Sequence, residues 1–177
     1  NNNLYYDVTG FYLTTDKDFD RYRVPSRGVQ TFYRNVGTSR RLGLEVYGKY
    51  TPIHSVDVQL AYTYSNFKYT SNSPDRIVMD DTTIVKFIKN GNWLPNSPQH
   101  QLYFDAQYRV VPEFALGFSV ESLSKAYIDG ANIDAEAVEG YTLIHARATY
   151  KWHLGPVIGE LSLNARNLGN VKYVAFS

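Results

Sequence analysis

The sequence is dominated by segments in which apolar and polar residues alternate with a period of two. Successive side chains of a β-strand point to opposite faces of a sheet, so this period predicts strands whose two faces meet different environments. The pattern occurs in 42–50, 56–64, 101–110, 114–121, 144–152 and 158–166, and a weaker form in 5–15 has apolar residues on both faces. The chain is therefore expected to be all-β, with about seven long strands in an antiparallel up-and-down meander.

The charged residues follow the same alternation. In the five clearest segments every Lys, Arg, Asp and Glu falls on the polar side, opposite a side filled with Leu, Val, Phe, Tyr and Trp. We expect the polar side to line an enclosed aqueous space, with most of its charges paired with one another or with an occupant of that space. The residues expected on this wall are Arg41, Glu45, Lys49, Asp105, Arg109, Glu121, Lys125, Arg147, Lys151 and Arg166.

Composition excludes several classes of protein. With 44% hydrophobic and 20% charged residues, the chain of 177 residues is not expected to be disordered. A net charge of +1 lacks the basic excess that a nucleic-acid partner requires. The absence of Cys excludes disulfide frameworks, thiol catalysis and thiolate metal sites. No stretch approaches the ~18 consecutive apolar residues of a membrane-spanning helix, but strands of a membrane barrel need only about 10 residues each.

The connections between the expected strands alternate in length. Those near 51–54, 111–113 and 155–156 are short, whereas those at about 16–30, 71–97 and 129–140 are long and polar. Short turns on one rim and long loops on the other are typical of an outer-membrane β-barrel. Aromatic residues near the short turns are expected to form a girdle at the membrane boundary, namely Tyr50, Tyr108, Phe114 and Trp152.

A soluble antiparallel sandwich is the structural alternative, since its strands also alternate between core and water. Its core would have to hold Tyr62, Tyr64, Tyr108, Tyr150 and Trp152, and each of their polar atoms would need a buried partner. Strands of about 10 residues also exceed the usual length of 5–6. These features favour the barrel.

Three motifs carry a resemblance to a known family. The segment 35–45 is similar to an N-x-G-x-x-R-x-x-G-x-E entry into a descending strand, and 94–100 is similar to L-P-x-x-P-x-H at the end of a long loop. The segment 167–173 is similar to the N-L-x-N-x-K/R-Y signature of a penultimate strand. With this order and spacing, the chain resembles the C-terminal part of the β-barrel of TonB-dependent outer-membrane receptors.

The resemblance implies that residues 1–177 form a C-terminal segment of a 22-stranded barrel, without the plug domain and the final closing strand. It implies a location in the bacterial outer membrane, contact with its lipid, and energy supplied through the TonB complex. The expected activity is active uptake of a scarce ligand, with a ferric siderophore or another iron complex as the first expectation. Vitamin B12, haem, sugars and other metal chelates stay open as ligands. A passive porin-like barrel and a soluble binding or adhesion module remain the functional alternatives.

No residue pattern predicts catalysis. The motifs H-E-x-x-H and G-x-S-x-G and the phosphate loop are absent, so neither an enzyme nor a cofactor or metal site is expected. Cationic side chains near the long-loop rim can hold carboxylate or catecholate oxygens of a chelated metal. The candidate ligand-binding residues are Arg34, Arg40, Arg41, Lys125, Tyr127, Arg147 and Arg166.

Overall fold

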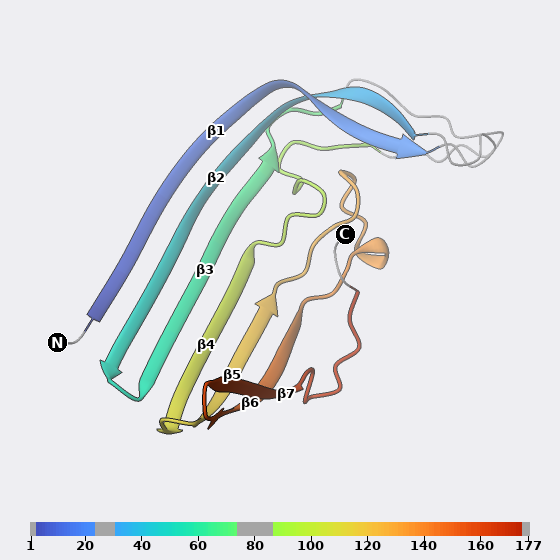
Figure 1. Ribbon diagram of the computed structural model, residues 1–177. Coiled ribbons are helices and arrows are strands. Elements are labelled where there is room, and N and C mark those ends of the chain that lie inside the picture. The colour runs from blue at the N-terminus through green and yellow to red at the C-terminus, as the bar shows by residue number, and fades with distance from the viewer. Residues whose placement is uncertain (1–2, 24–30, 74–86, 175–177) are drawn as a thin grey trace.

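The computed structural model describes residues 3–23, 31–73 and 87–174 and shows one antiparallel sheet (Figure 1). Its seven strands are hydrogen-bonded in sequence order, which confirms the expected meander. The strands are β1 (Asn3–Arg23), β2 (Thr31–Ile53), β3 (Val56–Tyr69), β4 (His100–Val111), β5 (Phe114–Leu123), β6 (Tyr141–Leu154) and β7 (Val157–Ala165). A short 3-10 helix, η2 (Asp134–Glu136), lies between β5 and β6. Among the described residues, no helix is long and apolar enough to cross a membrane.

The connections lie at opposite ends of the sheet according to their length (Figure 1). Two-residue turns join β2 to β3, β4 to β5 and β6 to β7. The last of these is Gly155–Pro156, where Gly155 has a φ of 59°, a value that favours glycine. The connections from β3 to β4 and from β5 to β6 are long and lie at the other end. The structure thus has a short-turn end and a long-loop end, as expected.

The expected loop at 16–30 is wrong in its extent. Strand β1 continues to Arg23 and β2 begins at Thr31, so the hairpin projects beyond the rest of the sheet. The register shifts between Thr15 and Asp18, and Lys17 has a φ of 58°. This bulge bends the strand without ending its pairing, because the backbone hydrogen bonds do not depend on an apolar side chain. The polar composition of this region therefore misled the sequence interpretation.

The sheet is a single layer with one apolar face. Its even-numbered residues in β2 to β6 share that face, as the pairs Leu60 with Phe104 and Phe118 with Ala146 show. Leu60 is 38% exposed and Phe118 is 43% exposed, and no second sheet covers them in the described residues. A soluble sandwich would bury this face against an opposing layer. The sandwich alternative is therefore excluded for the part of the chain that the structure describes.

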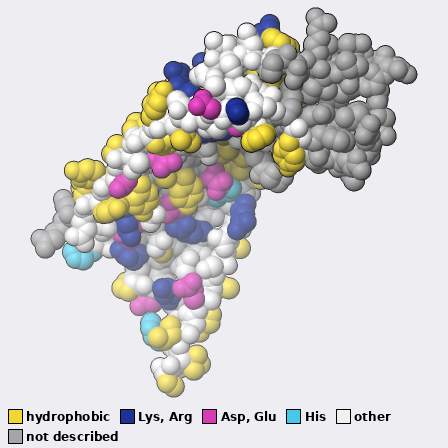
Figure 2. Space-filling model, turned by 90° about the horizontal axis from the view of Figure 1, so that it is seen from above, with side chains coloured by type: hydrophobic (Ala, Val, Ile, Leu, Met, Phe, Trp, Pro, Cys, Tyr) yellow, Lys and Arg dark blue, Asp and Glu magenta, His cyan; other side chains and the backbone are white. Residues whose placement is uncertain are grey.

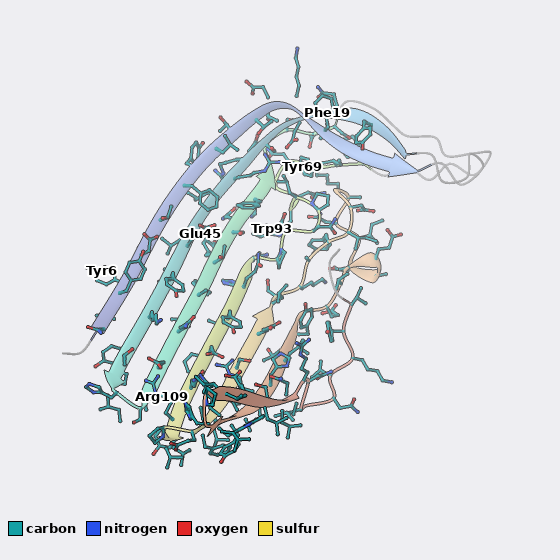
Figure 3. All side chains as sticks on the ribbon, in the orientation of Figure 1. Tyr6, Phe19, Glu45, Tyr69, Trp93 and Arg109 are labelled. Atoms are coloured by element: carbon teal, nitrogen blue, oxygen red, sulfur yellow. The ribbon has the colours of Figure 1, made fainter. Side chains whose placement is uncertain are left out.

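A small core lies at the long-loop end, between β2, the end of β3 and the connection from β3 to β4. Val36, Tyr69, Ile88 and Leu94 are buried there and pack together. Two long connections are joined beside this core, because the Trp93 amide donates to Asn132 Oδ1 at 2.5 Å and Asn132 Nδ2 donates to the Trp93 carbonyl at 2.9 Å. Figure 3 shows Tyr69 and Trp93 at this end and Arg109 at the short-turn end. The described parts of the two connections are thus held together at the long-loop end.

Candidate functional site

The polar face of the sheet carries acidic and basic side chains close to one another (Figure 2). Arg109 pairs with Asp57 at 3.2 Å and Lys151 pairs with Glu160 at 3.4 Å, each across neighbouring elements of the sheet. Such pairs leave no large field of one sign on the wall. The structure thus agrees with the expectation that many of the wall charges neutralise one another.

The best-connected pair on this face joins Arg147 of β6 to Asp105 of β4. Arg147 donates from Nη1 to Asp105 Oδ2 at 2.9 Å and from Nη2 to Asp105 Oδ1 at 3.0 Å. It also donates to Gln107 Oε1 at 3.1 Å. Strand β5 lies between the two strands, and Gly117 occupies the position over which Arg147 passes. The guanidinium is therefore held in place by a bidentate contact and is largely occupied.

A hollow of about 390 Å³ lies beside this pair, between β5, β6 and the segment after β7. Its lining includes Glu121, His145, Arg147 and Arg166. The Asn167 amide donates to His145 Nδ1 at 3.1 Å, so the neutral ring carries its proton on Nε2. That Nε2 atom lies 3.8 Å from Glu121 Oε1. The hollow therefore combines a carboxylate, an imidazole and two guanidinium groups.

A second hollow, of about 360 Å³, lies nearer the long-loop end. Its charged residues are Arg41 and Asp18, whose Nη2 and Oδ2 atoms are 3.0 Å apart. Ser39 also hydrogen-bonds to Asp18, and its hydroxyl accepts from Arg41 at 3.1 Å. The aromatic lining comprises Phe19, Tyr33, Phe67 and Tyr69. This hollow offers a cation beside the exposed rings of Phe19 and Tyr33, a combination that suits a flat anionic group.

Lys125 and Tyr127 lie together on the long connection between β5 and β6. Lys125 Nζ is 2.6 Å from Asp134 Oδ1, and the Tyr127 hydroxyl donates to the same oxygen at 3.1 Å. The hydrogen bond with Asp134 raises the pKa of Lys125 and of Tyr127 above their ordinary values. The same two hydrogen bonds, that from Lys125 first, lower the pKa of Asp134. These contacts connect the start of the loop to η2.

The structure does not bring all the candidate cations to one place. Arg40 pairs with Thr14 and Lys68 on the apolar face, because it neighbours Arg41 in the same strand and points to the other side. Arg34 lies in β2 opposite Asp20, but its side chain is outside the described part. Arg147 and Arg166 share one hollow, Arg41 lines the other, and Lys125 with Tyr127 stays on its loop.

Sequence reasoning missed several residues of these hollows, among them Asp18, Phe19 and Tyr33. They lie in the region expected to be a loop or just beyond it. The available signal was the run of aromatic residues on both sides of 24–30, which is typical of a hairpin rather than a solvated loop. Among the described residues, no group of three or more His, Cys, Asp or Glu is arranged to hold a metal ion.

The four aromatic residues expected near the membrane boundary lie on the apolar face near the short turns. Tyr50 and Tyr108 are 37% and 49% exposed. Phe114 pairs with Tyr150, and the Trp152 ring lies over Gly159 with a Tyr150 ring stacked 6.4 Å away. Their placement fits the expected girdle, which stays a prediction.

Comparison with known proteins finds one family across the chain. The family profile described as "TonB dependent receptor-like, beta-barrel" matches residues 1–168. A curated relative, the probable TonB-dependent siderophore receptor PiuA of Acinetobacter baumannii, is 26% identical over 167 residues. This match covers 94% of the chain and 21% of the relative, so the chain spans about a fifth of that protein's length.

Solved structures agree with this match. The crystal structure of PiuA from A. baumannii has a TM-score of 0.73 and 25% identity, covering 96% of this chain and 22% of that one. BauA, the ferric preacinetobactin receptor of the same species, has a TM-score of 0.68 and 22% identity, with coverage of 96% and 24%. The ferric-catecholate import receptor Fiu of E. coli K12 has a TM-score of 0.66 and 19% identity, with coverage of 97% and 22%. The likeness to BauA and Fiu concerns the fold.

Proposed function

The chain belongs to the TonB-dependent receptor β-barrel family, and on that premise we propose that the intact protein takes up a ferric siderophore or a similar iron chelate with energy supplied through TonB. Barrels of this family are outer-membrane proteins of Gram-negative bacteria, and the family consists of receptors and transporters rather than enzymes. The seven strands would then be one part of a larger barrel of 22 strands, with a plug domain elsewhere in the protein.

One observation supports the proposal most directly: one face of the single sheet is apolar and the other is charged. The apolar face has exposed large side chains on every strand from β2 to β7, namely Leu44, Leu60, Tyr108, Phe118, Ile144 and Leu163. The other face holds the ion pairs and both hollows. A sheet of this kind needs hydrocarbon on one side and water on the other, which is the arrangement of a membrane barrel with a polar lumen.

The structure favours some candidate ligand contacts over others. Arg147 already makes three hydrogen bonds to Asp105 and Gln107, so it is better suited to shaping the wall than to binding. Arg166 lines the same hollow, is exposed, and has no ion pair with any residue that the structure describes. We therefore assign the first role in binding an anionic ligand to Arg166, with Arg41 serving the second hollow. Lys125 and Tyr127 would contribute from the loop above.

Uptake by whole cells tests the proposal. Iron-starved cells producing the full-length receptor would be given ⁵⁵Fe complexes of catecholate, hydroxamate and carboxylate siderophores, with and without TonB. The proposal requires saturable uptake of at least one complex that stops when TonB is deleted. Uptake that persists without TonB and does not saturate would instead identify a passive porin-like barrel.

A further inference from the structure

Three residues on adjacent strands and one on the connection between β3 and β4 form a row across the apolar face near the long-loop end. Thr14 of β1 lies opposite Arg40 of β2, and Arg40 lies opposite Lys68 of β3. An isolated bridge places Trp93 opposite Lys68. Residues directly opposite one another share a face of the sheet. We call Thr14, Arg40, Lys68 and Trp93 the basic row.

The basic row lies at the edge of the apolar band. The distance along β2 from Tyr50 to Arg40 is ~34 Å at ~3.4 Å per residue. With strands tilted by about 40°, this corresponds to a height of ~25 Å, the thickness of the apolar band of such barrels. Leu42 and Leu44 lie within this band, on the same face. If Tyr50 marks one membrane boundary, the basic row marks the other, on the long-loop side.

The two cations of the row lack an anionic partner. Arg40 and Lys68 lie directly opposite each other, a placement that is unfavourable for like charges. Neither forms an ion pair with any residue in the described ranges, and Arg40 Nε is buried without a hydrogen-bond partner there. Lys68 Nζ lies 4.2 Å from the centroid of the Trp93 ring, which positions the ammonium but does not neutralise it.

On the opposite face of the sheet, neighbouring cations do have anionic partners. There Arg41, one residue from Arg40, pairs with Asp18 at 3.0 Å, and Arg147 pairs with Asp105 at 2.9 Å. Arg41 and Arg147 of the lumen wall are thus matched by carboxylates of this chain, whereas Arg40 and Lys68 of the lipid-facing rim are not. The complementary anion must come from outside the described sheet, at the height of the lipid headgroups.

We propose that the basic row binds the phosphate of a phosphorylated lipid headgroup in the outer leaflet of the outer membrane. The Arg40 guanidinium can donate two parallel hydrogen bonds to phosphate oxygens, and the Lys68 ammonium adds a second charge. The exposed Thr14 hydroxyl supplies a further donor from the neighbouring strand. The lipid's acyl chains would lie along Leu42 and Leu44, directly below the row on β2. This inference depends on the membrane location and not on which ligand is transported.

Lipid retention by the unmodified receptor is the first test. The full-length protein would be reconstituted in phosphatidylcholine nanodiscs containing either lipid A, a bisphosphorylated glycolipid, or the same lipid without its phosphates. Native mass spectrometry would count the glycolipids retained after release from the disc. The proposal requires retention of the phosphorylated lipid only, weakening as the salt concentration rises. Equal retention of both lipids, or displacement by millimolar inorganic phosphate alone, would overturn it.

Charge-removing variants locate the contact. Arg40→Gln and Lys68→Gln are each expected to lower the affinity for lipid A about fivefold, and Arg40→Lys less than Arg40→Gln. Lys49→Gln is the matched control, because it removes one positive charge from the same strand on the opposite face. A loss with Lys49→Gln equal to that with Arg40→Gln would contradict the assignment. If a variant fails to fold, the comparison of the two lipids with the unmodified protein still decides the question.

Discussion

Asp105 and Arg147 form a bidentate ion pair across an intervening strand, with contacts of 2.9 and 3.0 Å. Strand β5 separates their strands, and the residue that pairs with Arg147 on β5 is Gly117. A Cβ atom at this glycine would lie 2.5 Å from Arg147 Cγ. The missing side chain therefore opens the path by which Arg147 reaches two strands away. The pair connects three strands of the wall.

Removal of Arg147 should cost more stability than removal of its partner's charge. Arg147→Met leaves the Asp105 carboxylate unpaired in a site where that residue is only 7% exposed, at a cost of about 2–3 kcal/mol. Asp105→Asn leaves the Arg147 guanidinium, whose side chain is 35% exposed and within reach of water, and should cost less. Urea unfolding of the full-length receptor in detergent, followed by tryptophan fluorescence, measures both. Additive effects in the double variant would contradict a direct pairing.

A methyl group at Gly117 should disrupt the same pair from the strand between. Gly117→Ala would displace the Arg147 side chain and is expected to cost ~1–3 kcal/mol. Gly48→Ala is the control, because a Cβ at that glycine meets no atom within 4 Å. It should change the free energy of unfolding by no more than about 0.5 kcal/mol. Equal effects of the two substitutions would show that the space over Gly117 is not needed.

The faces of the strands were predictable from the sequence, because a one-residue slip would move every apolar side chain into water. That constraint correctly assigned residues such as Arg147 and Leu60 to opposite faces. The bulge between Thr15 and Asp18 was not predictable, because no residue type in this segment signals it. It changes which residues of β1 point to the polar face. This is why Asp18 was missed as the partner of Arg41.

Which candidate residues contact one another depends on the register between paired strands. The alternation within a single strand does not specify that register. Asp105 and Arg147 were both expected on the wall, but their contact requires Gly117 to lie between them. Arg40 and Arg41 were both expected to contact the ligand because of their charge and their predicted height near the long-loop rim. Adjacent residues of a strand point to opposite faces, so Arg40 lies on the apolar face and Arg41 on the polar face.

The contact between Lys125 and Asp134 should hold its loop over a defined pH range. Asp134 has a lowered pKa, so the contact is complete above its ordinary value of 3.8 and is lost as the pH falls through the lowered value. Lys125 has a raised pKa, so the contact is complete below 10.5 and is lost as the pH rises through the raised value. Hydrogen exchange of the paired Ala126 and Val138 amides, corrected for intrinsic rates, should be constant between these limits.

Substitution of Asp134 tests the contact between Lys125 and Asp134 at neutral pH. Asp134→Asn should increase exchange of the Ala126 and Val138 amides, because it removes the charge that holds Lys125. Glu139→Gln should have a smaller effect, since Glu139 lies 4.0 Å from Lys125 Nζ rather than 2.6 Å. Faster exchange with Glu139→Gln than with Asp134→Asn would contradict the assigned contact.

Ligand affinity should depend on Arg166 more than on neighbouring surface cations. Arg166→Gln removes an unpaired guanidinium from the larger hollow and should weaken binding of an anionic iron chelate about tenfold. Lys172→Gln removes an equal charge from an exposed residue outside that lining and should have little effect. Titration of the purified full-length receptor by quenching of its tryptophan fluorescence gives both affinities. An unchanged affinity with Arg166→Gln would rule out this contact.

Site-directed spin labelling tests the two-sided character of the sheet most directly. The chain has no native Cys, so single cysteines at Leu60, Phe118, Gln59 and Ser119 can be labelled individually. In the full-length receptor in bilayers, labels at Leu60 and Phe118 are predicted to collide with oxygen dissolved in the lipid and not with a water-soluble nickel chelate. Labels at Gln59 and Ser119 are predicted to show the reverse. Access of the nickel chelate to Leu60 and Phe118 equal to that at Gln59 and Ser119 would contradict a membrane-facing surface.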